Sequence, residues 1–339
     1  MNWFYILIFL GSCGLLFLSG QWLVGALTRI AKFLGWREFV VAFFIMALAG
    51  SLPNLFVGIS SALHKIPQLS FGDIVGGNLV DLTIVIALAV LITKGLPAES
   101  RTVQTTSLFT IGVAILPLIL ILDGVLGRGD GILLILCFAF YISWLFSKKE
   151  RFTRTYDEDK PRTEISLVRG DELHSSPRFA NVRVIKEFKI FIKDIGRVIL
   201  GIVFLLAAAE GIVRAASFFT ESLNLSIPLI GILIVGLGNA LPEGYFAIVS
   251  ARSGRTWMIL GNLMGAIVVP ATLVLGIVAL ICPIEILDFS PFAIGRFFLI
   301  ISAIFFLFFV RTDRKITKKE AIFLLLIYII FIVVELLAG

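Results

Sequence analysis

The chain has 339 residues, of which 59% are hydrophobic and 15% are charged, and its formal net charge is +6. Soluble domains carry about 25% charged residues to cover their surface, so this composition excludes an ordinary water-soluble protein and indicates a membrane protein. The basic residues lie between apolar segments, and no nucleic-acid partner is expected.

Ten apolar segments are long enough to cross about 30 Å of hydrocarbon. Strand-type alternation is absent from them, and every backbone group inside a bilayer needs an internal hydrogen-bond partner, so we expect helices. The predicted fold is an all-α membrane protein with ten transmembrane helices. In chain order the segments lie at 3–28, 38–63, 70–93, 103–122, 128–147, 195–219, 226–250, 257–281, 289–310 and 320–338.

The basic residues are divided unequally between the two sets of loops. If the N-terminus is outside, all but four of the 29 Lys and Arg residues lie on or near the inner side, which is the positive-inside pattern. We therefore predict a multi-pass protein of the inner (plasma) membrane, with both termini outside and residues 148–193 in the cytoplasm. The four exceptions are Lys65, Arg128, Arg214 and Arg296.

One hydrophilic segment, 148–193, separates five predicted helices from the other five. It is too short to hold a sizeable core of its own. We predict a first repeat at 1–147, a cytoplasmic linker at 148–193 and a second repeat at 194–339. The end of the linker, 184–193, has the pattern of an amphipathic helix at the membrane surface.

The two halves repeat at a fixed offset, which carries position 53 onto position 242, and Pro and Gly match in register. Five helices per half is an odd number, so the second copy enters the membrane upside down. Inverted repeats with Gly- or Pro-broken segments at matching places are typical of secondary transporters. The matches are Leu52-Pro53 with Leu241-Pro242, Ser61-Ala62 with Ser250-Ala251, Gly72 with Gly261, Gly76 with Gly265, and Thr83 with Thr272.

Each half contains two neighbouring motifs. Residues 49–54 read AGSLPN and residues 72–81 read GDIVGGNLVD, while residues 238–243 read GNALPE and residues 261–270 read GNLMGAIVVP. These motifs resemble the α-repeats of the sodium/calcium exchanger superfamily of cation antiporters, whose pattern is G-T-S-L-P-E followed by G-N-x-x-G-S-N-x-x-N/D. The chain is similar to a divergent member. The resemblance covers most of the chain and implies a secondary active cation antiporter that works by alternating access.

The resemblance implies cation ligands after each motif proline and at the end of each second motif. Here these positions hold Asn54, Asp81, Glu243 and Pro270, so each half keeps one acid. Acids in the middle of apolar helices are costly and usually functional. Asp81 and Glu243 are therefore the expected metal ligands. Further expected cation ligands are Asn54, Ser51, Gly50 and Asn239.

The motif prolines, Pro53 and Pro242, are predicted to break their helices at membrane depth. A proline lacks an N–H group and crowds the preceding turn, so carbonyl groups near Gly50 and Asn239 lose their donors. Irregular backbone is tolerated there where it lines a cavity, and carbonyl oxygens are ligands for hard cations. The alternative interpretation is an ordinary kink at each proline.

Two other acids lie within predicted helices. Glu210 and Arg214 are four residues apart, the spacing of an intrahelical ion pair, and we expect a gating or structural pair. Asp73 is expected to lie nearer the membrane interface, where a structural role explains it as well as a functional one.

Three functions stay open. Two carboxylates neutralise a divalent cation, so exchange of Ca²⁺ for Na⁺ or H⁺ is the leading hypothesis. Neighbouring carboxylates resist simultaneous ionisation, so a monovalent cation/H⁺ exchanger on the same fold is the second, and a non-transporting scaffold with a decayed ion site is the third. No nucleophile–base set or phosphate-binding loop indicates an enzyme.

The expected partners are small cations and membrane lipid. We expect no cofactor besides the transported Ca²⁺, Na⁺ or H⁺. The oligomeric state does not follow from the sequence.

Overall fold

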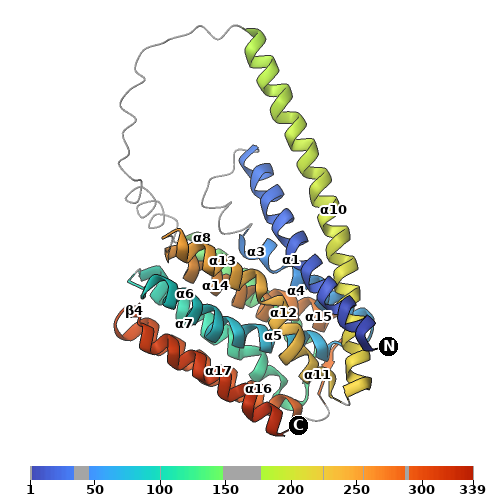
Figure 1. Cartoon of the computed structure of the whole chain (residues 1–339), viewed down its shortest axis with the longest axis vertical. Helices are drawn as coiled ribbons and strands as arrows, with labels where there is room; N and C mark the ends of the chain where they lie inside the picture. The colour runs from blue at the N-terminus through green and yellow to red at the C-terminus, as the bar shows by residue number, and fades with distance from the viewer. Residues whose placement is uncertain are drawn as a thin grey trace.

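The computed structural model describes residues 2–33, 46–99, 101–147, 177–223, 225–254, 256–286 and 290–338. Apart from four two-residue strands, the regular elements of these ranges are helices, which agrees with the predicted all-α class (Figure 1). The first half contains α1 (Asn2–Phe33), α3 (Met46–Gly50), α4 (Leu52–Leu63), α5 (Gln68–Val80), η2 (Asp81–Val85), α6 (Ile86–Thr93), β1 (Leu96–Pro97), α7 (Arg101–Leu120), η3 (Ile121–Asp123), β2 (Val125–Leu126) and α8 (Arg128–Ser147).

The second half contains the same kinds of element in a similar order. They are α10 (Pro177–Leu223), α11 (Ile227–Ile230), η4 (Gly231–Val235), α12 (Gly236–Asn239), α13 (Leu241–Arg252), α14 (Thr256–Val269), η5 (Pro270–Val274), α15 (Leu275–Ile281), β3 (Ile284–Glu285), α16 (Ser290–Thr312), β4 (Lys315–Ile316) and α17 (Lys318–Ala338). The segments η2, η4 and η5 are π-helical turns. Such turns occur mostly singly inside α-helices and are frequent at functional sites.

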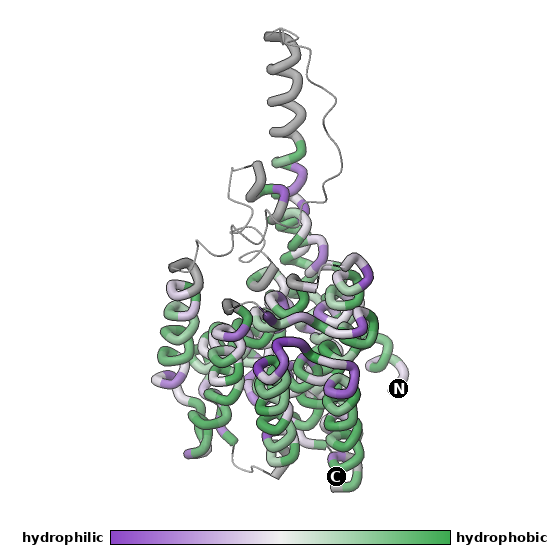
Figure 2. The backbone as a smooth tube through the Cα atoms, turned by 90° about the vertical axis from the view of Figure 1, so that its left-hand side faces the viewer, coloured by the Kyte–Doolittle hydropathy of each residue, from purple (hydrophilic) through white to green (hydrophobic). Residues whose placement is uncertain are grey.

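Seven helical segments of the described ranges are long and apolar enough to cross a membrane, and each coincides with a predicted segment. Of the other three predictions, 128–147 and 320–338 correspond to α8 and α17. The third, 38–63, contains α3 and α4, and its residues 38–45 lie outside the described ranges. Figure 2 shows that the helices are hydrophobic along most of their length and hydrophilic mainly near the turns. The seven segments are Trp3–Leu27, Gln68–Thr93, Val103–Asp123, Ile190–Leu223, Ile227–Arg252, Ile259–Ile281 and Phe292–Thr312.

Helix α10 is 47 residues long and begins inside the predicted linker. Its first residue is Pro177, and proline is common at a helix start because the N–H groups there lack intrahelical partners. Residues 184–193, which we expected to form a separate surface helix, continue into the apolar span without a break. The rest of the predicted linker, 148–176, lies outside the described ranges.

The elements of the two halves recur at the offset seen in the sequence. Helix α4 begins at Leu52 and α13 at Leu241, and the π-turns η2 and η5 begin at Asp81 and Pro270. Strand β1 pairs with β4 and β2 with β3, both antiparallel. Adding the offset to the residue numbers of β1 and β2 gives the positions of β3 and β4 to within one residue. The pair β1–β4 in one place therefore corresponds to the pair β3–β2 in the other.

The buried apolar side chains form two main clusters. The larger joins α5 to α8 with α13 to α17, and the smaller lies between α1 and α10 with contributions from α4, α5 and η4. Helix α1 runs beside α10 at the edge of the bundle (Figure 1). The α1–α10 pair is therefore packed as a unit of its own against the rest.

Glycine residues let α5 contact the α11–η4–α12 segment backbone to backbone. A Cβ atom at Gly76 would collide with the carbonyl group of Ile232, and one at Gly236 would lie 2.7 Å from the Gly77 nitrogen. Small residues permit such close helix approach in membranes. This contact places Asp73 of α5 beside Asn239, the last residue of α12.

Candidate functional site

Both motif prolines follow a break in a helix. The helix is interrupted at Ser51, between α3 and α4, and at Ala240, between α12 and α13. The two residues have nearly the same backbone angles, φ −87° and ψ 0° for Ser51 and φ −80° and ψ −5° for Ala240. Pro53 and Pro242 are the second residues of the new helices, so neither offers an N–H group to the carbonyl four residues earlier.

A small polar cavity of about 10 Å³ lies where the two halves meet, with room for about one water molecule. Four of its lining residues are predicted cation ligands, and each is buried. Asn54 and Asp81 come from α4 and η2 in the first half, and Asn239 and Glu243 come from α12 and α13 in the second. The other lining residues are Ile74, Gly77, Asn78, Ala240, Ala266 and Pro270.

Three oxygen atoms of the lining side chains are buried without a hydrogen-bond partner among the described residues. They are Asp81 Oδ1, Asn239 Oδ1 and Glu243 Oε2. A buried acceptor without a partner costs about 1–3 kcal/mol, and more when it is charged. Three such atoms around one cavity, contributed by both halves, have the arrangement of ligands for a cation.

Asp73 joins this group through Asn239. The Asn239 amide nitrogen donates to both oxygen atoms of the Asp73 carboxyl group, at 3.0 Å and 2.8 Å. Asp73 is completely buried, and it lies two helical turns before Asp81. Our expectation of a position nearer the interface missed this contact, since Asn239 belongs to the other half of the chain.

The remaining predicted ligands lie at the edge of the site. Gly50 ends α3 and Ser51 is buried at the first break, but neither lines the cavity. Pro270 does line it and offers no side-chain oxygen. Gly77 and Ala266 line the cavity at positions where the family carries hydroxyl groups. The polar side chains that line the cavity are therefore those of the two acids and three asparagines.

The acids are too few for a cluster of charged ligands. Across the described ranges, no three His, Cys, Asp or Glu side chains lie close enough together to hold one metal ion. A shell around a cation at this cavity would therefore combine Asp81 and Glu243 with amide and backbone carbonyl oxygens. Ca²⁺ accepts such mixed oxygen shells.

The predicted pair of Glu210 and Arg214 is present and is part of a larger network. Arg214 Nε donates to Glu210 Oε1 over 2.7 Å, Ser60 donates to Glu210 Oε2 over 3.1 Å, and His64 Nε2 is 3.3 Å from Glu210 Oε1. Ser60 and His64 lie in and directly after α4, so the network ties α10 to the helix that carries Asn54. Sequence spacing reveals the first contact only, because the others join distant segments.

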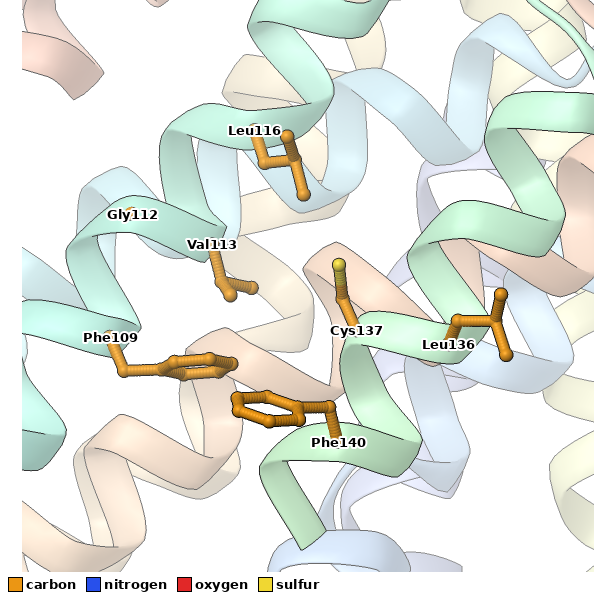
Figure 3. A pocket seen from close by; sticks show the side chains of 7 residues that line it. All are labelled: Phe109, Gly112, Val113, Leu116, Leu136, Cys137 and Phe140. Carbon is orange, nitrogen blue, oxygen red and sulfur yellow. The ribbon is translucent and has the colours of Figure 1, made fainter. Parts of the chain in front are cut away.

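A larger groove of about 410 Å³ lies between α7 and α8, away from this site (Figure 3). Phe109 and Phe140 approach each other across it, with ring centroids 6.4 Å apart. Its lining is apolar and contains no acid or amide, so it offers nothing to a cation. We therefore do not include it in the candidate cation site.

Comparison with known proteins agrees with these observations. The sequence model of the family described as sodium/calcium exchanger protein matches residues 4–147 and 193–337. Sodium/calcium exchanger MaX1 of Methanosarcina acetivorans is 25% identical over 337 residues, which cover 95% of this chain and 96% of MaX1. Inner membrane protein YrbG of Escherichia coli is 25% identical over 292 residues, which cover 85% of this chain and 83% of YrbG.

Solved structures agree on the fold. A structure of the sodium-calcium exchanger NCX_Mj, soaked with Na⁺ and Sr²⁺, matches with a TM-score of 0.61 at 22% identity, over 98% of this chain and 99% of that one. The prediction that the chain is a transporter and not an enzyme is confirmed by the family match. Together with the apolar helices and the buried acids, these matches show that the chain is a multi-pass membrane protein belonging to the sodium/calcium exchanger family of cation antiporters.

Proposed function

We propose that the protein exchanges Ca²⁺ for Na⁺ or H⁺ across the inner (plasma) membrane by alternating access. The observation that carries this proposal is the cavity in which Asp81 and Glu243, one acid from each half, present unpartnered oxygen atoms. Two carboxylates balance one divalent cation. Asn54 and Asn239 add neutral oxygens toward the about six to eight that Ca²⁺ takes, and Ser51, Gly50 and the carbonyl groups at the breaks are the nearest further donors.

The proposed architecture is ten transmembrane helices in two inverted five-helix repeats, 1–147 and 194–339, joined by a cytoplasmic linker at 148–193, with both termini outside. The recurrence of elements at one fixed offset supports it, as does the exchange of the two strand pairs. The α1–α10 pair packs as a cluster of its own. It is therefore the unit that can shift against the core and open the cavity to either side.

A monovalent cation/H⁺ exchanger is the second candidate, and one observation favours it. Two of the four positions where the family carries ligands are filled here by Asn54 and Pro270, which bear no charge. Only two acids line the cavity within the described residues. Each of them can instead hold one Na⁺ or one H⁺, because protons and monovalent ions compete for the same carboxylate oxygens.

The test is transport by the purified protein in liposomes, with uptake of radiolabelled Ca²⁺ measured under a Na⁺ gradient and, separately, under a pH gradient. Uptake that depends on an imposed gradient supports the first candidate and identifies the counter-ion. Na⁺ uptake driven by pH, with no Ca²⁺ uptake, supports the second. Absence of both would contradict the proposal and leave a scaffold whose ion site has decayed.

A further inference from the structure

Helix α10 is tied to α4 by polar contacts at Glu210. Ser60 Oγ donates to Glu210 Oε2 over 3.1 Å, and His64 Nε2 lies 3.3 Å from Glu210 Oε1. These two contacts join different helices, whereas the bond from Arg214 to Glu210 stays within α10. The carboxylate of Glu210 therefore holds the end of α4 against α10.

The repeat allows this contact to be compared with its equivalent between α1 and α13. The corresponding residues are Gln21 for Glu210, Val249 for Ser60 and Ser253 for His64. A valine side chain has no polar group, and the Ser253 hydroxyl donates to the Val249 carbonyl group of its own helix, 2.8 Å away. These four helices therefore carry a charged tie at one end of the α1–α10 pair, and the matching position at the other end holds uncharged residues.

The packing of the α1–α10 pair is unequal in the same sense. Its apolar cluster includes Phe56 and Val57 of α4, and α13 contributes no residue to it within the described ranges. Helix α10 makes more extensive contact with α4 than α1 makes with α13. The rings of Phe17 and Tyr245 do join α1 to α13, with centroids 5.4 Å apart. An exact two-fold relation would make the two contacts equal, so the pair is displaced toward α4.

We propose that Glu210, Ser60 and His64 form a latch that favours one of the two conformations of the exchange cycle. The α1–α10 pair packs as a unit, so a movement that separates α10 from α4 at one end brings α1 toward α13 at the other. The latch stabilises the first contact, and the second has no charged equivalent. In the proposed topology α4 and α10 both end at the outer side, so the latch favours the conformation closed to the outside. This inference rests on the proposed function.

A latch at the outer end makes the apparent cation affinity differ between the two sides. An outer cation binds only molecules open to the outside, and its apparent affinity falls with the fraction of such molecules. The Glu210 side chain is 34% exposed, so water weakens the contacts, and we expect the latch to change this fraction about three- to tenfold. Ser60→Ala/His64→Ala should therefore raise the apparent Ca²⁺ affinity from the outer side by about this factor. The affinity from the inner side should change little.

Distances between spin labels test the conformational change itself. One pair of labels is placed at Leu63 of α4 and Ser222 of α10, and the other at Trp22 of α1 and Arg252 of α13. All four positions are exposed, and the labels are introduced into a protein without native cysteines. Loss of the latch should lengthen the first distance and shorten the second in the same fraction of molecules, because the α1–α10 pair moves as a unit.

The two ends of the pair offer matched variants. Ser60→Ala/His64→Ala removes both contacts between the helices and leaves Glu210 its bond from Arg214. Val249→Ala/Ser253→Ala makes the equivalent change at the other end and should leave both distances as in the wild type. Gln21→Glu/Val249→Ser/Ser253→His builds the equivalent contact between α1 and α13. It should shift both distances in the direction that loss of the latch does.

A local tie and a latch predict different results at the second pair of labels. If Ser60→Ala/His64→Ala changes the first distance and leaves the second unchanged, the contact only joins α4 to α10 and the inference is wrong. Unchanged populations at both pairs would contradict it equally. The proposed function fails on a separate result, which is wild-type protein that transports neither Ca²⁺ nor Na⁺ in liposomes.

Discussion

Arg29 of α1 and Asp194 of α10 form an ion pair through two hydrogen bonds, from Nε to Oδ2 and from Nη2 to Oδ1, each 2.8 Å long. The repeat offset carries these two positions onto Phe218 and Tyr5, whose rings stack with centroids 3.9 Å apart and planes 9° apart. The α1–α10 pair is antiparallel, and equivalent positions of the two halves are thus in contact at each of its ends. The proposed two-fold relation between the halves predicts this exchange of partners.

We expect Asp194→Asn to lower the free energy of unfolding by about 1–2 kcal/mol. The Asp194 side chain is buried and accepts hydrogen bonds from Arg29 and Arg197, so the variant weakens two charged contacts. The loss is limited because both arginines are partly exposed and regain water. Thermal unfolding of the detergent-purified protein at low and at high salt measures it.

Phe218→Leu at the other end of the α1–α10 pair is the comparison. It should cost about 0.5–1.5 kcal/mol from the lost aromatic stack, and this loss should not respond to salt. The effect of Asp194→Asn should shrink in high salt, because ions screen partly exposed charges. An Asp194→Asn protein that unfolds at the wild-type temperature would show that the ion pair does not stabilise α1 against α10.

Removal of either acid of the cavity should abolish exchange. Asp81→Asn and Glu243→Gln each leave one carboxylate facing a divalent cation, and we expect Ca²⁺ affinity to fall at least about tenfold, or about 1.4 kcal/mol. Insertion and purification should be normal, because a neutral amide is easier to bury than a carboxylate. Transport in liposomes and Ca²⁺ binding test this.

Glu221→Gln is a suitable control, since it makes the same chemical change at an exposed position of α10. It should transport at the wild-type rate. If Asp81→Asn or Glu243→Gln also transports at that rate, the cation binds elsewhere.

His64 ties α4 to α10 through its imidazole ring. Its Nδ1 is 2.8 Å from the Ser60 carbonyl oxygen, and its Nε2 is 3.3 Å from Glu210 Oε1. Because Ser60 belongs to α4 and Glu210 to α10, the ring connects the two helices. Removal of the ring should therefore loosen α4 against α10.

The measurement is the distance between spin labels on α4 and α10 in the wild type and in His64→Ala, with native cysteines replaced. The distribution should be broader in His64→Ala than in the wild type. Arg214 contacts Glu210 within α10 itself, so Arg214→Gln should keep the narrow distribution. A narrow distribution in His64→Ala would show that His64 does not hold α4 against α10.

Much of this arrangement is readable from the sequence, because the apolar segments and the motif prolines are local signals. The interruptions at Ser51 and Ala240 follow from the prolines two residues later. Asp81 and Glu243 stand out as acids in apolar segments, and the repeat predicts that they meet. The structure brings both to one cavity.

The contacts that were not predicted are those set by packing between the halves. Asp73 and Asn239 form a pair because glycines let the backbone of α5 contact the backbones of η4 and α12. The periodicity of hydrophobic residues in the sequence does not predict such a close approach. The π-turns that begin at Asp81 and Pro270 were also missed, since one added residue per turn leaves no pattern in hydrophobicity. One signal was available in the sequence. Asn239 carries an amide group at a position where the family carries a hydroxyl group.

The orientation in the membrane is open to a direct test. A cysteine introduced at Tyr156, which lies outside the described ranges, should resist an impermeant thiol reagent added to intact cells. The positive-inside bias places this segment in the cytoplasm. Glu285→Cys, exposed in β3 at the proposed outer end, should react, and both variants are made in a protein without native cysteines. Labelling of position 156 from outside would reverse the proposed topology.

Asn54→Glu adds a third acid to the lining of the cavity. Asn54 and Glu243 hold corresponding positions in the two halves, and both line the cavity. With Asp81 and Glu243 ionised the lining carries two negative charges, and the variant raises this number to three. Carboxylates this close resist simultaneous ionisation, so one of them holds a proton at neutral pH and releases it as the pH rises. We expect tighter Ca²⁺ binding than wild type at alkaline pH, with the difference shrinking toward acid pH.

Asn54→Gln separates charge from size, because it lengthens the side chain without adding an acid. Ca²⁺ affinity of the wild type and both variants, measured from about pH 6 to about pH 9, should give a steeper curve for Asn54→Glu only. The slope at its steepest can exceed that of the wild type by about tenfold in affinity per pH unit, the effect of one coupled proton. Parallel curves for all three proteins would place residue 54 outside the cation shell, where it only supports the start of α4.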